Sequence, residues 1–213
     1  MMATVVEIHL PELDEQILEH ASVVIRAGGI IVYPTETLYG IGADALNATA
    51  VRKVIANKKE RGKKPIGVIA GNLQQVSMVA ASVNSFARML IDNLWPGPLT
   101  LIFDATPIVP PEITGDTGTI GVRIPSNNFC LALLRRTGCV LTATSANVSG
   151  TMPEKSIQKI QASLDGPIDL FIDAGILKEG KPSTVLDVRG TDPVLIREGA
   201  IPFQQIQSLL RTA

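Results

Sequence analysis

Histidine is scarce in this chain of 213 residues. His9 and His20 are its two histidines, and both lie near the N-terminus, far along the chain from every motif considered below. A serine–histidine–aspartate triad or a zinc site normally needs a histidine close to the chemistry. The composition therefore argues against both kinds of site and directs attention to hydroxyls, amides and cations.

Cysteine, aromatic side chains and excess charge are also in short supply. Cys130 and Cys139 stand in a mostly apolar stretch without a metal-ligand spacing, so we expect two reduced cysteines in the core. The formal net charge of −1 provides no global field toward nucleic acid or an anionic membrane. Aromatic residues make up 4% of the chain, which leaves few rings to stack on bases.

Long apolar runs are missing as well. No stretch approaches the ~18 uninterrupted apolar residues of a membrane-spanning helix. The start of the chain, MMATVVEIHL, has no basic segment followed by a long apolar one. The 46% of hydrophobic residues is nevertheless enough to bury a substantial core. We expect a soluble, cytoplasmic protein that makes no use of a membrane.

Short apolar segments alternate with segments of helical periodicity, but not regularly enough for a strict strand–helix repeat. The expected strands cover residues 4–9, 30–34, 66–71, 99–103, 119–125, 139–147, 169–175, 183–188 and 194–199. The expected helices cover residues 13–27, 48–58, 72–80, 84–94, 126–136, 156–164 and 203–211, with Asn72 and Ser126 as N-caps. This pattern predicts an α/β protein with one open, twisted mixed β-sheet flanked by helices, in a single domain over residues 1–213.

The stretch VYPTETLYGIG, residues 32–42, holds two threonines between a proline and two glycines. If this stretch is extended, Thr35, Thr37 and Tyr39 project to one side of the strand and form a row of hydroxyls. The two glycines leave the backbone open to close approach. The alternative is a strand edge whose side chains are satisfied within the protein.

Basic residues are concentrated in one loop, and a further arginine lies in a predicted strand. Between Arg52 and Lys64 there are seven basic residues and one acid, Glu60, which indicates either a solvated face or a binding site for a polyphosphate. Arg123 lies in the strand TIGVRIP, on the face opposite its branched apolar residues. A guanidinium there suggests an anion held against the sheet, or an ion pair with a neighbouring carboxylate.

Small polar residues mark the ends of other strands. LTATSANVSG carries Ser145 and Asn147, in a loop that could present N–H groups to phosphate oxygens or form an ordinary polar turn. No adjacent base is visible to activate Ser145 as a nucleophile. Ser183 opens a further strand, and Arg197 closes another.

These segments supply hydroxyls, amides and cations at strand ends, but no evident general base. Such groups suit nucleotidyl or phosphoryl transfer, in which positioning and charge neutralisation provide much of the catalysis. The chain contains neither G-x-x-x-x-G-K-[ST] nor G-x-G-x-x-G, so it is neither a P-loop nor a Rossmann protein. The residues alone indicate a ligand-binding α/β enzyme with an anionic substrate. Its metal ligands stay unknown, with four candidate carboxylates: Glu36, Asp44, Asp173 and Asp187.

The same segments, in the same order, resemble those of the YrdC/Sua5 family, the threonylcarbamoyl-AMP synthases. The resemblance rests on YPTETLYGIGADA, KKERGKKPIGV, LWPGPLTLIF, GVRIPSN, LTATSANVSG, PSTVLDV and IREGAI, and it spans residues 28–201. It implies the family's YrdC-like α/β fold, with an open twisted mixed sheet and a large concave basic cavity. The chain is similar to the short members, so we expect one YrdC-like domain without the additional C-terminal Sua5 domain.

The resemblance also implies an activity. Threonylcarbamoyl-AMP synthases convert L-threonine, bicarbonate and ATP into threonylcarbamoyl-adenylate and pyrophosphate, with Mg²⁺ accompanying the ATP. The product serves N6-threonylcarbamoyladenosine formation in tRNA, through a tRNA-modifying transferase of the TsaD/Kae1 type. Two alternatives stay open. One is an RNA-binding module on the same fold, and the other is a carbamoyl- or nucleotide-hydrolysing enzyme that does not require threonine.

Individual site residues follow from the same resemblance. Thr35, Thr37 and Tyr39 match the threonine site of the family. Arg123 matches an arginine near threonine and phosphate, with a catalytic role. The positions that the family uses around the nucleotide correspond to Ser145, Asn147, Ser183 and Arg197.

Lys59 and Arg61 match the family's K-x-R pair, which grips the nucleotide phosphates and is counted as catalytic. This chain departs from the pattern here, because Gly62 stands where the family usually has proline and the loop is shorter. Lys58 or Lys63 could therefore take the place of Lys59.

Overall fold

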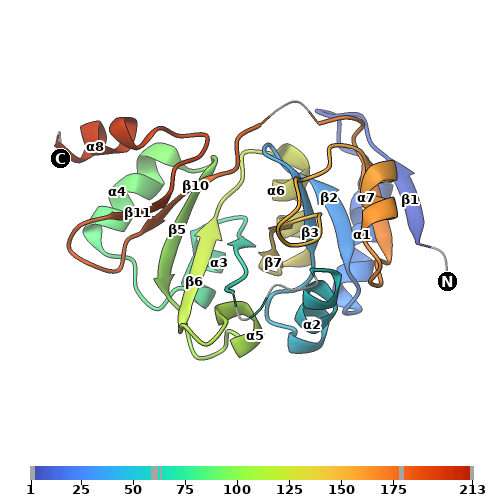
Figure 1. The fold of residues 1–213 in the computed structure, drawn as a ribbon, viewed down its shortest axis with the longest axis horizontal. Coiled ribbons are helices and arrows are strands. Elements are labelled where there is room, and N and C mark those ends of the chain that lie inside the picture. The colour runs from blue at the N-terminus through green and yellow to red at the C-terminus, as the bar shows by residue number, and fades with distance from the viewer. Residues whose placement is uncertain (1–2, 59–61, 63, 178–179, 212–213) are drawn as a thin grey trace.

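The protein is described by a computed structural model that covers residues 3–58, 62, 64–177 and 180–211. The N-terminal strand and the C-terminal helix lie at opposite ends of the molecule (Figure 1). The described strands are β1 (Thr4–Glu7), β2 (Ile31–Pro34), β3 (Tyr39–Gly42), β4 (Val68–Ile69), β5 (Leu99–Asp104), β6 (Thr119–Arg123), β7 (Leu141–Thr142), β8 (Thr144–Ser145), β9 (Leu170–Asp173), β10 (Thr184–Asp187) and β11 (Val194–Arg197). The helices are α1 (Glu15–Arg26), α2 (Ala48–Asn57), α3 (Leu73–Val79), α4 (Ser85–Leu94), α5 (Pro111–Thr114), α6 (Asn128–Thr137), α7 (Ile157–Ser163) and α8 (Phe203–Arg211).

The strands form two mixed sheets, which confirms the α/β class with mixed strand directions. The first sheet has the order β1-β9-β2-β3-β8, and the second has the order β11-β10-β5-β6-β4-β7. In the first sheet β1, β9 and β2 are parallel, and β3 is antiparallel to both of its neighbours. In the second sheet β10 is parallel to β5 and β4 is parallel to β6, whereas the other pairs are antiparallel. The expectation of one continuous sheet is therefore wrong.

The division arises in the segment that was expected to be one strand over residues 139–147. This segment forms β7, which pairs with β4 of the second sheet, and then β8, which pairs with β3 of the first. Thr142 fixes the position at which the chain passes from the second sheet to the first. Its hydroxyl accepts from Ala43 N at 3.0 Å and donates to Ile41 O at 2.9 Å. Its own N–H donates to Ala43 O at 2.9 Å. Buried hydrogen bonds along residues 141–145 thus join the two sheets.

Helices cover both faces of the first sheet. Ile31 and Tyr33 of β2 are buried on one face with residues of α1 and α6, such as Ile25 and Leu133. Val32, which alternates with them, is buried on the other face against residues of α2 and α7. This two-sided burial explains why the segment 30–34 is apolar throughout.

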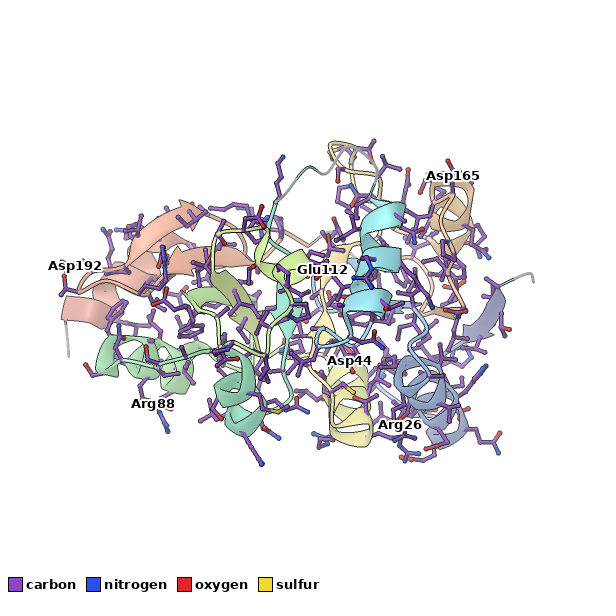
Figure 2. All side chains as sticks on the ribbon, turned by 90° about the horizontal axis from the view of Figure 1, so that it is seen from below. Arg26, Asp44, Arg88, Glu112, Asp165 and Asp192 are labelled. Atoms are coloured by element: carbon purple, nitrogen blue, oxygen red, sulfur yellow. The ribbon has the colours of Figure 1, made fainter. Side chains whose placement is uncertain are left out.

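The second sheet is covered on one face by α3, α4 and α8. Leu99, Leu101 and Phe103 of β5 point into this core, and the alternating residues Thr100 and Ile102 point to the opposite face. That opposite face looks toward the first sheet and stays open. Figure 2 shows charged side chains such as those of Arg26 and Arg88 on the outside of the molecule.

An aspartate or asparagine side chain caps α1, α2, α3, α4 and α6. Asn72 accepts from Gln75 N and caps α3, as its position predicts. The predicted cap at Ser126 is wrong, because Asn127 occupies the N-cap of α6 and its side chain accepts from Cys130 N.

Among the described helices, none combines the length and apolar character that crossing a lipid bilayer requires. That residues 1–213 act as a single domain without a Sua5 domain stays a prediction.

We expect the change of sheet to depend on the Thr142 hydroxyl. Thr142→Val keeps the shape of the side chain but leaves the buried Ala43 N–H without an acceptor. This should lower the free energy of unfolding by about 1–3 kcal/mol, measured by urea denaturation. Thr142→Ser retains the hydroxyl and serves as the control. Equal stability of Thr142→Val and the wild-type protein would contradict this role.

Candidate active site

A cavity of about 1030 Å³ lies between the two sheets. The first sheet contributes the turn between β2 and β3 and the segment around β8, and the second sheet contributes residues from β5, β6, β10 and β11. The predicted site residues that line this cavity are Thr35, Thr37, Tyr39, Arg123, Ser145, Ser183 and Arg197. Segments far apart in the sequence therefore meet in one hollow, as the resemblance implied.

The threonines do not lie on an extended strand, so the predicted row of hydroxyls is wrong. Strands β2 and β3 form an antiparallel hairpin, and residues 35–38 are its turn. The Thr35 hydroxyl donates to Leu38 O at 2.7 Å and accepts from the N–H groups of Thr37 and Leu38, both at 3.1 Å. A hydroxyl has one hydrogen and two lone pairs. The Thr35 side chain is thus fully used in closing the turn.

Thr37 is the hydroxyl that the turn leaves for a ligand. Its Oγ1 lies 2.9 Å from Thr35 Oγ1 and accepts from Arg123 Nη1 at 3.3 Å. Because Thr35 Oγ1 already uses its hydrogen and both lone pairs in the turn, the Thr37 hydrogen is available to a ligand oxygen. A ligand oxygen that takes this hydrogen leaves Thr35 with its other three hydrogen bonds.

Tyr39 lines the cavity with its ring and uses its hydroxyl elsewhere. The hydroxyl donates to Gly175 O at 2.8 Å and accepts from Ala174 N at 2.9 Å, which ties β3 to the turn after β9. Burial raises the pKa of Tyr39 to about 12, so the hydroxyl keeps its hydrogen. Tyr39 supports the wall of the cavity rather than offering a polar group to it.

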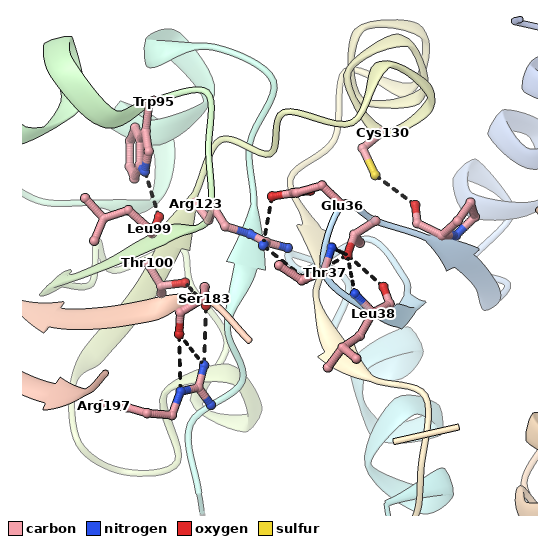
Figure 3. Close-up of polar contacts among 12 residues, drawn as sticks. Glu36, Thr37, Leu38, Trp95, Leu99, Thr100, Arg123, Cys130, Ser183 and Arg197 are labelled. Carbon is pink, nitrogen blue, oxygen red and sulfur yellow. Dashed lines mark hydrogen bonds and ion pairs between the residues drawn. The ribbon is translucent and has the colours of Figure 1, made fainter. Parts of the chain in front are cut away.

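Arg123 pairs with a carboxylate at the edge of the cavity. It lies at the end of β6, is 6% exposed and lines the cavity. Its Nη1 donates to Glu36 Oε1 at 3.0 Å, across from the second sheet to the turn of the first (Figure 3). The predicted carboxylate partner is therefore present, and the guanidinium still faces the cavity.

Lys58 meets the loop that carries Ser145 and Asn147. Its Nζ donates to Ser145 O at 2.7 Å, to Asn147 O at 2.6 Å and to Asn147 Oδ1 at 3.2 Å. The Asn147 amide donates to Thr151 O at 2.7 Å, so it closes the same loop from the other side. Ser145 Oγ hydrogen bonds to Asn147 Oδ1. Of the lysines considered for the phosphates, Lys58 thus positions this loop.

Three further basic residues of that segment were considered for the nucleotide phosphates. Lys59, Arg61 and Lys63 lie outside the described residues, so their predicted grip on the nucleotide phosphates stays a prediction. The described part of the segment ends beside the cavity, because Pro65 and Gly67 are among the residues that line it.

Ser183, which precedes β10, and Arg197 of β11 line the cavity, whereas Thr184 of β10 holds the backbone. Ser183 Oγ lies 2.9 Å from Thr100 Oγ1, and Arg197 donates through Nη2 to Ser183 O at 2.9 Å (Figure 3). Thr184, which is fully buried, accepts from Gly199 N at 3.0 Å and donates to Ile201 O at 2.6 Å. Thr184 therefore holds the chain that follows Arg197, while Ser183 and Arg197 face the cavity.

Positive charge dominates the described lining. The charged side chains there are Arg123, Lys155, Lys181 and Arg197, against one acid, Glu154. Burial, and then the nearby charge of Arg123, lower the pKa of Arg197. No described acid pairs with Arg197. Two arginines that repel one another across a cavity favour an anion between them.

The carboxylates considered as metal ligands are engaged within the protein. The described residues contain no cluster of three or more His, Cys, Asp or Glu side chains that could hold a metal ion. The partners of the four candidates are Arg123 for Glu36, Leu46 N for Asp44, Gly175 N for Asp173 and Arg189 for Asp187.

Several residues of the site were missed in the sequence. Thr100 could have been found, because it alternates with the apolar residues of β5 and so faces the same side as Ile102. Lys155, Lys181 and Gly180 come from loops, and no periodicity marks them. A Cβ at Gly180 would lie 2.9 Å from Thr37 O, so only glycine allows this segment to pass over the turn.

The fold and the cavity together define an α/β protein with a mostly basic cavity between two mixed sheets. Residues 23–199 match the family described as telomere recombination, whose name joins Sua5, YciO and YrdC. The chain belongs to this family.

Relatives and solved structures agree with this membership. The threonylcarbamoyl-AMP synthase of Pyrococcus abyssi is 33% identical over 198 residues, which cover 93% of this chain and 58% of that protein. The crystal structure of P. abyssi Sua5 complexed with L-threonine has a TM-score of 0.90 and 32% identity, covering 99% of this chain and 61% of the other. The structure of Escherichia coli YciO has a TM-score of 0.86 and 29% identity, covering 96% and 100%. The chain thus spans just under three fifths of the synthase.

The two threonines of the turn should separate in their effect on stability. Thr35→Val removes three hydrogen bonds of a buried turn and should lower the free energy of unfolding by about 1–3 kcal/mol. Thr37→Val leaves those bonds in place and should cost under about 1 kcal/mol. Chemical denaturation of both variants measures the difference. A larger loss in Thr37→Val would reverse the assignment.

Proposed function

We propose that the protein is an L-threonylcarbamoyladenylate synthase, a nucleotidyltransferase that joins L-threonine, bicarbonate or CO2, and ATP into threonylcarbamoyl-AMP and pyrophosphate. The observation that carries the proposal is the meeting of Thr37, Arg123, Ser145 and Arg197 in one cavity. The names of the relatives support it, and so does the threonine-bound structure of P. abyssi Sua5.

The chemistry requires positioning more than proton transfer. The threonine amine attacks the carbon of CO2, loses a proton and becomes an N-carboxylate. One oxygen of this carboxylate then forms a bond to the α-phosphorus of ATP while the bond to the β-phosphate oxygen breaks, and pyrophosphate leaves with the electron pair. Preorganised cations that face the transferring group stabilise the charge that develops.

The described residues have distinct roles in this proposal. Thr37 offers its hydroxyl to the amino acid, and Arg123 offers cation and N–H donors to carboxylate or phosphate. Lys58 holds the loop of Ser145 and Asn147 against the nucleotide, and Ser183 and Arg197 bind it from the second sheet. Lys59 and Arg61 are proposed to neutralise the leaving pyrophosphate.

Mg²⁺ is proposed to enter with ATP. Magnesium sites of this kind use phosphate oxygens, water and one or two carboxylates rather than a dedicated protein cage. Glu154 is the acid among the described residues that line the cavity, so it is the candidate for a contact to the hydrated ion. Bound Mg²⁺ would neutralise the charge that develops on the leaving pyrophosphate.

The product is proposed to pass to a tRNA-modifying transferase of the TsaD/Kae1 type in the cytoplasm. An acyl adenylate is a reactive mixed anhydride, so its value lies in transfer of the threonylcarbamoyl group to an amine. We also propose that this chain binds RNA weakly.

The decisive experiment is pyrophosphate release from ATP with each substrate omitted in turn. The proposal expects release that requires both L-threonine and bicarbonate, together with formation of an adenylate detected by mass spectrometry. Release without threonine would instead establish a nucleotide-hydrolysing enzyme. Steeply salt-dependent RNA binding without any turnover would establish the RNA-binding module.

Arg197→Ala should raise the KM for ATP by roughly 10- to 100-fold, the value of one hydrogen bond to a charged group. The matched control is Arg189→Ala, because Arg189 lies outside the cavity and pairs with the partly exposed Asp187 and Asp104. Steady-state kinetics of pyrophosphate release measure both. Similar KM values in the two variants would remove Arg197 from the nucleotide site.

A further inference from the structure

We propose that Glu36 is a positioning residue that holds the Arg123 guanidinium so that its Nε and Nη2 edge faces the cavity. This inference rests on the proposed function for its substrate, and on the contacts of the pair for its geometry. Glu36 belongs to the turn of the first sheet and Arg123 to β6 of the second, so the pair also spans the two sheets.

The hydrogen bonds of Arg123 are unevenly distributed. Glu36 Oε1 and Thr37 Oγ1 both accept from Nη1, at 3.0 Å and 3.3 Å. No described residue accepts from Nε or Nη2, and neither nitrogen is among the fully covered side-chain atoms without a partner. Those donors therefore keep their access to the cavity that Arg123 lines.

The remaining edge has a definite recognition geometry. Nε and Nη2 form one of the two parallel donor pairs with which a guanidinium binds a carboxylate or a phosphate side-on. If Nη1 were not fixed, rotation about the last side-chain bonds would present other edges. Glu36 thus selects which donor pair meets the anion.

Glu36 has few other ways to act. Its side chain is 17% exposed, and it does not line the cavity. Among the described residues its Oε1 has one partner, Arg123, and its buried Oε2 has none. The carboxylate therefore affects a ligand through Arg123. The pair is also almost buried, with Arg123 at 7% side-chain exposure, and a buried cation without its partner is strongly unfavourable.

A double-mutant cycle tests this dependence. The variants are Glu36→Ala, Glu36→Gln, Arg123→Ala and the double Glu36→Ala/Arg123→Ala, with Glu112→Gln as a control that removes the surface ion pair with Arg52. Each is assayed for kcat and KM in pyrophosphate release, for binding of inorganic pyrophosphate by calorimetry and for thermal stability.

Glu36→Ala should lower kcat/KM for threonine by roughly 10- to 100-fold, the scale of a misplaced catalytic group. Glu36→Gln keeps an oxygen acceptor and should recover most of that loss, and Glu112→Gln should behave as wild type. The double variant should match Arg123→Ala, because without the guanidinium Glu36 has nothing to position.

Three outcomes would overturn the inference: unchanged kinetics in Glu36→Ala, a further loss from Glu36→Ala in the Arg123→Ala background, or a loss in Glu36→Gln as large as that in Glu36→Ala. A wild-type protein that releases no pyrophosphate with threonine would instead reject the proposed function. The calorimetric cycle with inorganic pyrophosphate then decides on Glu36 by itself, since non-additive binding supports the positioning role and additive binding refutes it.

Discussion

The architecture depends on a short segment that belongs to both sheets. Residues 141–145 leave the second sheet and enter the first within a single extended run, and the hydrogen bonds of Thr142 fix the point of change. One face of the second sheet therefore looks toward the first sheet, and its residues line the cavity instead of packing on a described helix. The cavity is the space that this constraint leaves, and the strand ends of both sheets open into it.

Polar motifs around the cavity share one arrangement, in which one residue builds the loop and a neighbour lines the cavity. Thr35 closes the hairpin turn and Thr37 is presented by it. Thr184 fixes the chain after β11, while Ser183 faces inward. Asn147 and Lys58 hold the loop of Ser145. Paired small polar residues in such motifs can therefore have different structural roles.

Much of this organisation could be predicted from the sequence. Asn72 and Asn84 mark helix starts because an asparagine side chain can accept a hydrogen bond from one of the first N–H groups of a helix, which have no partner within it. The segment 30–34 is uniformly apolar because both of its faces are buried, and the convergence of Arg123, Ser145 and Arg197 follows from a family resemblance. The alternation of Leu99, Thr100 and Leu101 also indicates which face of β5 is polar.

Other features could not be read in advance. The sequence of residues 35–38 is compatible with both an extended strand and a turn. The hydrogen bonds of the Thr35 side chain determine that these residues form a turn. The division into two sheets depends on pairing between segments about 100 residues apart, such as Ala43 with Thr142, which local patterns do not encode. The partner of Arg123 was equally hidden, because Glu36 is 87 residues away in the chain.

The position of the cavity between the sheets has a thermodynamic consequence. A ligand that contacts Thr37 and Ser145 of the first sheet and Arg123 and Arg197 of the second would link the two sheets reversibly. Binding of this kind adds RT ln(1 + [L]/Kd) to the resistance against unfolding, or about 2.7 kcal/mol at a hundredfold excess over Kd. The resistance of the folded chain to unfolding would then rise and fall with the concentration of such a ligand.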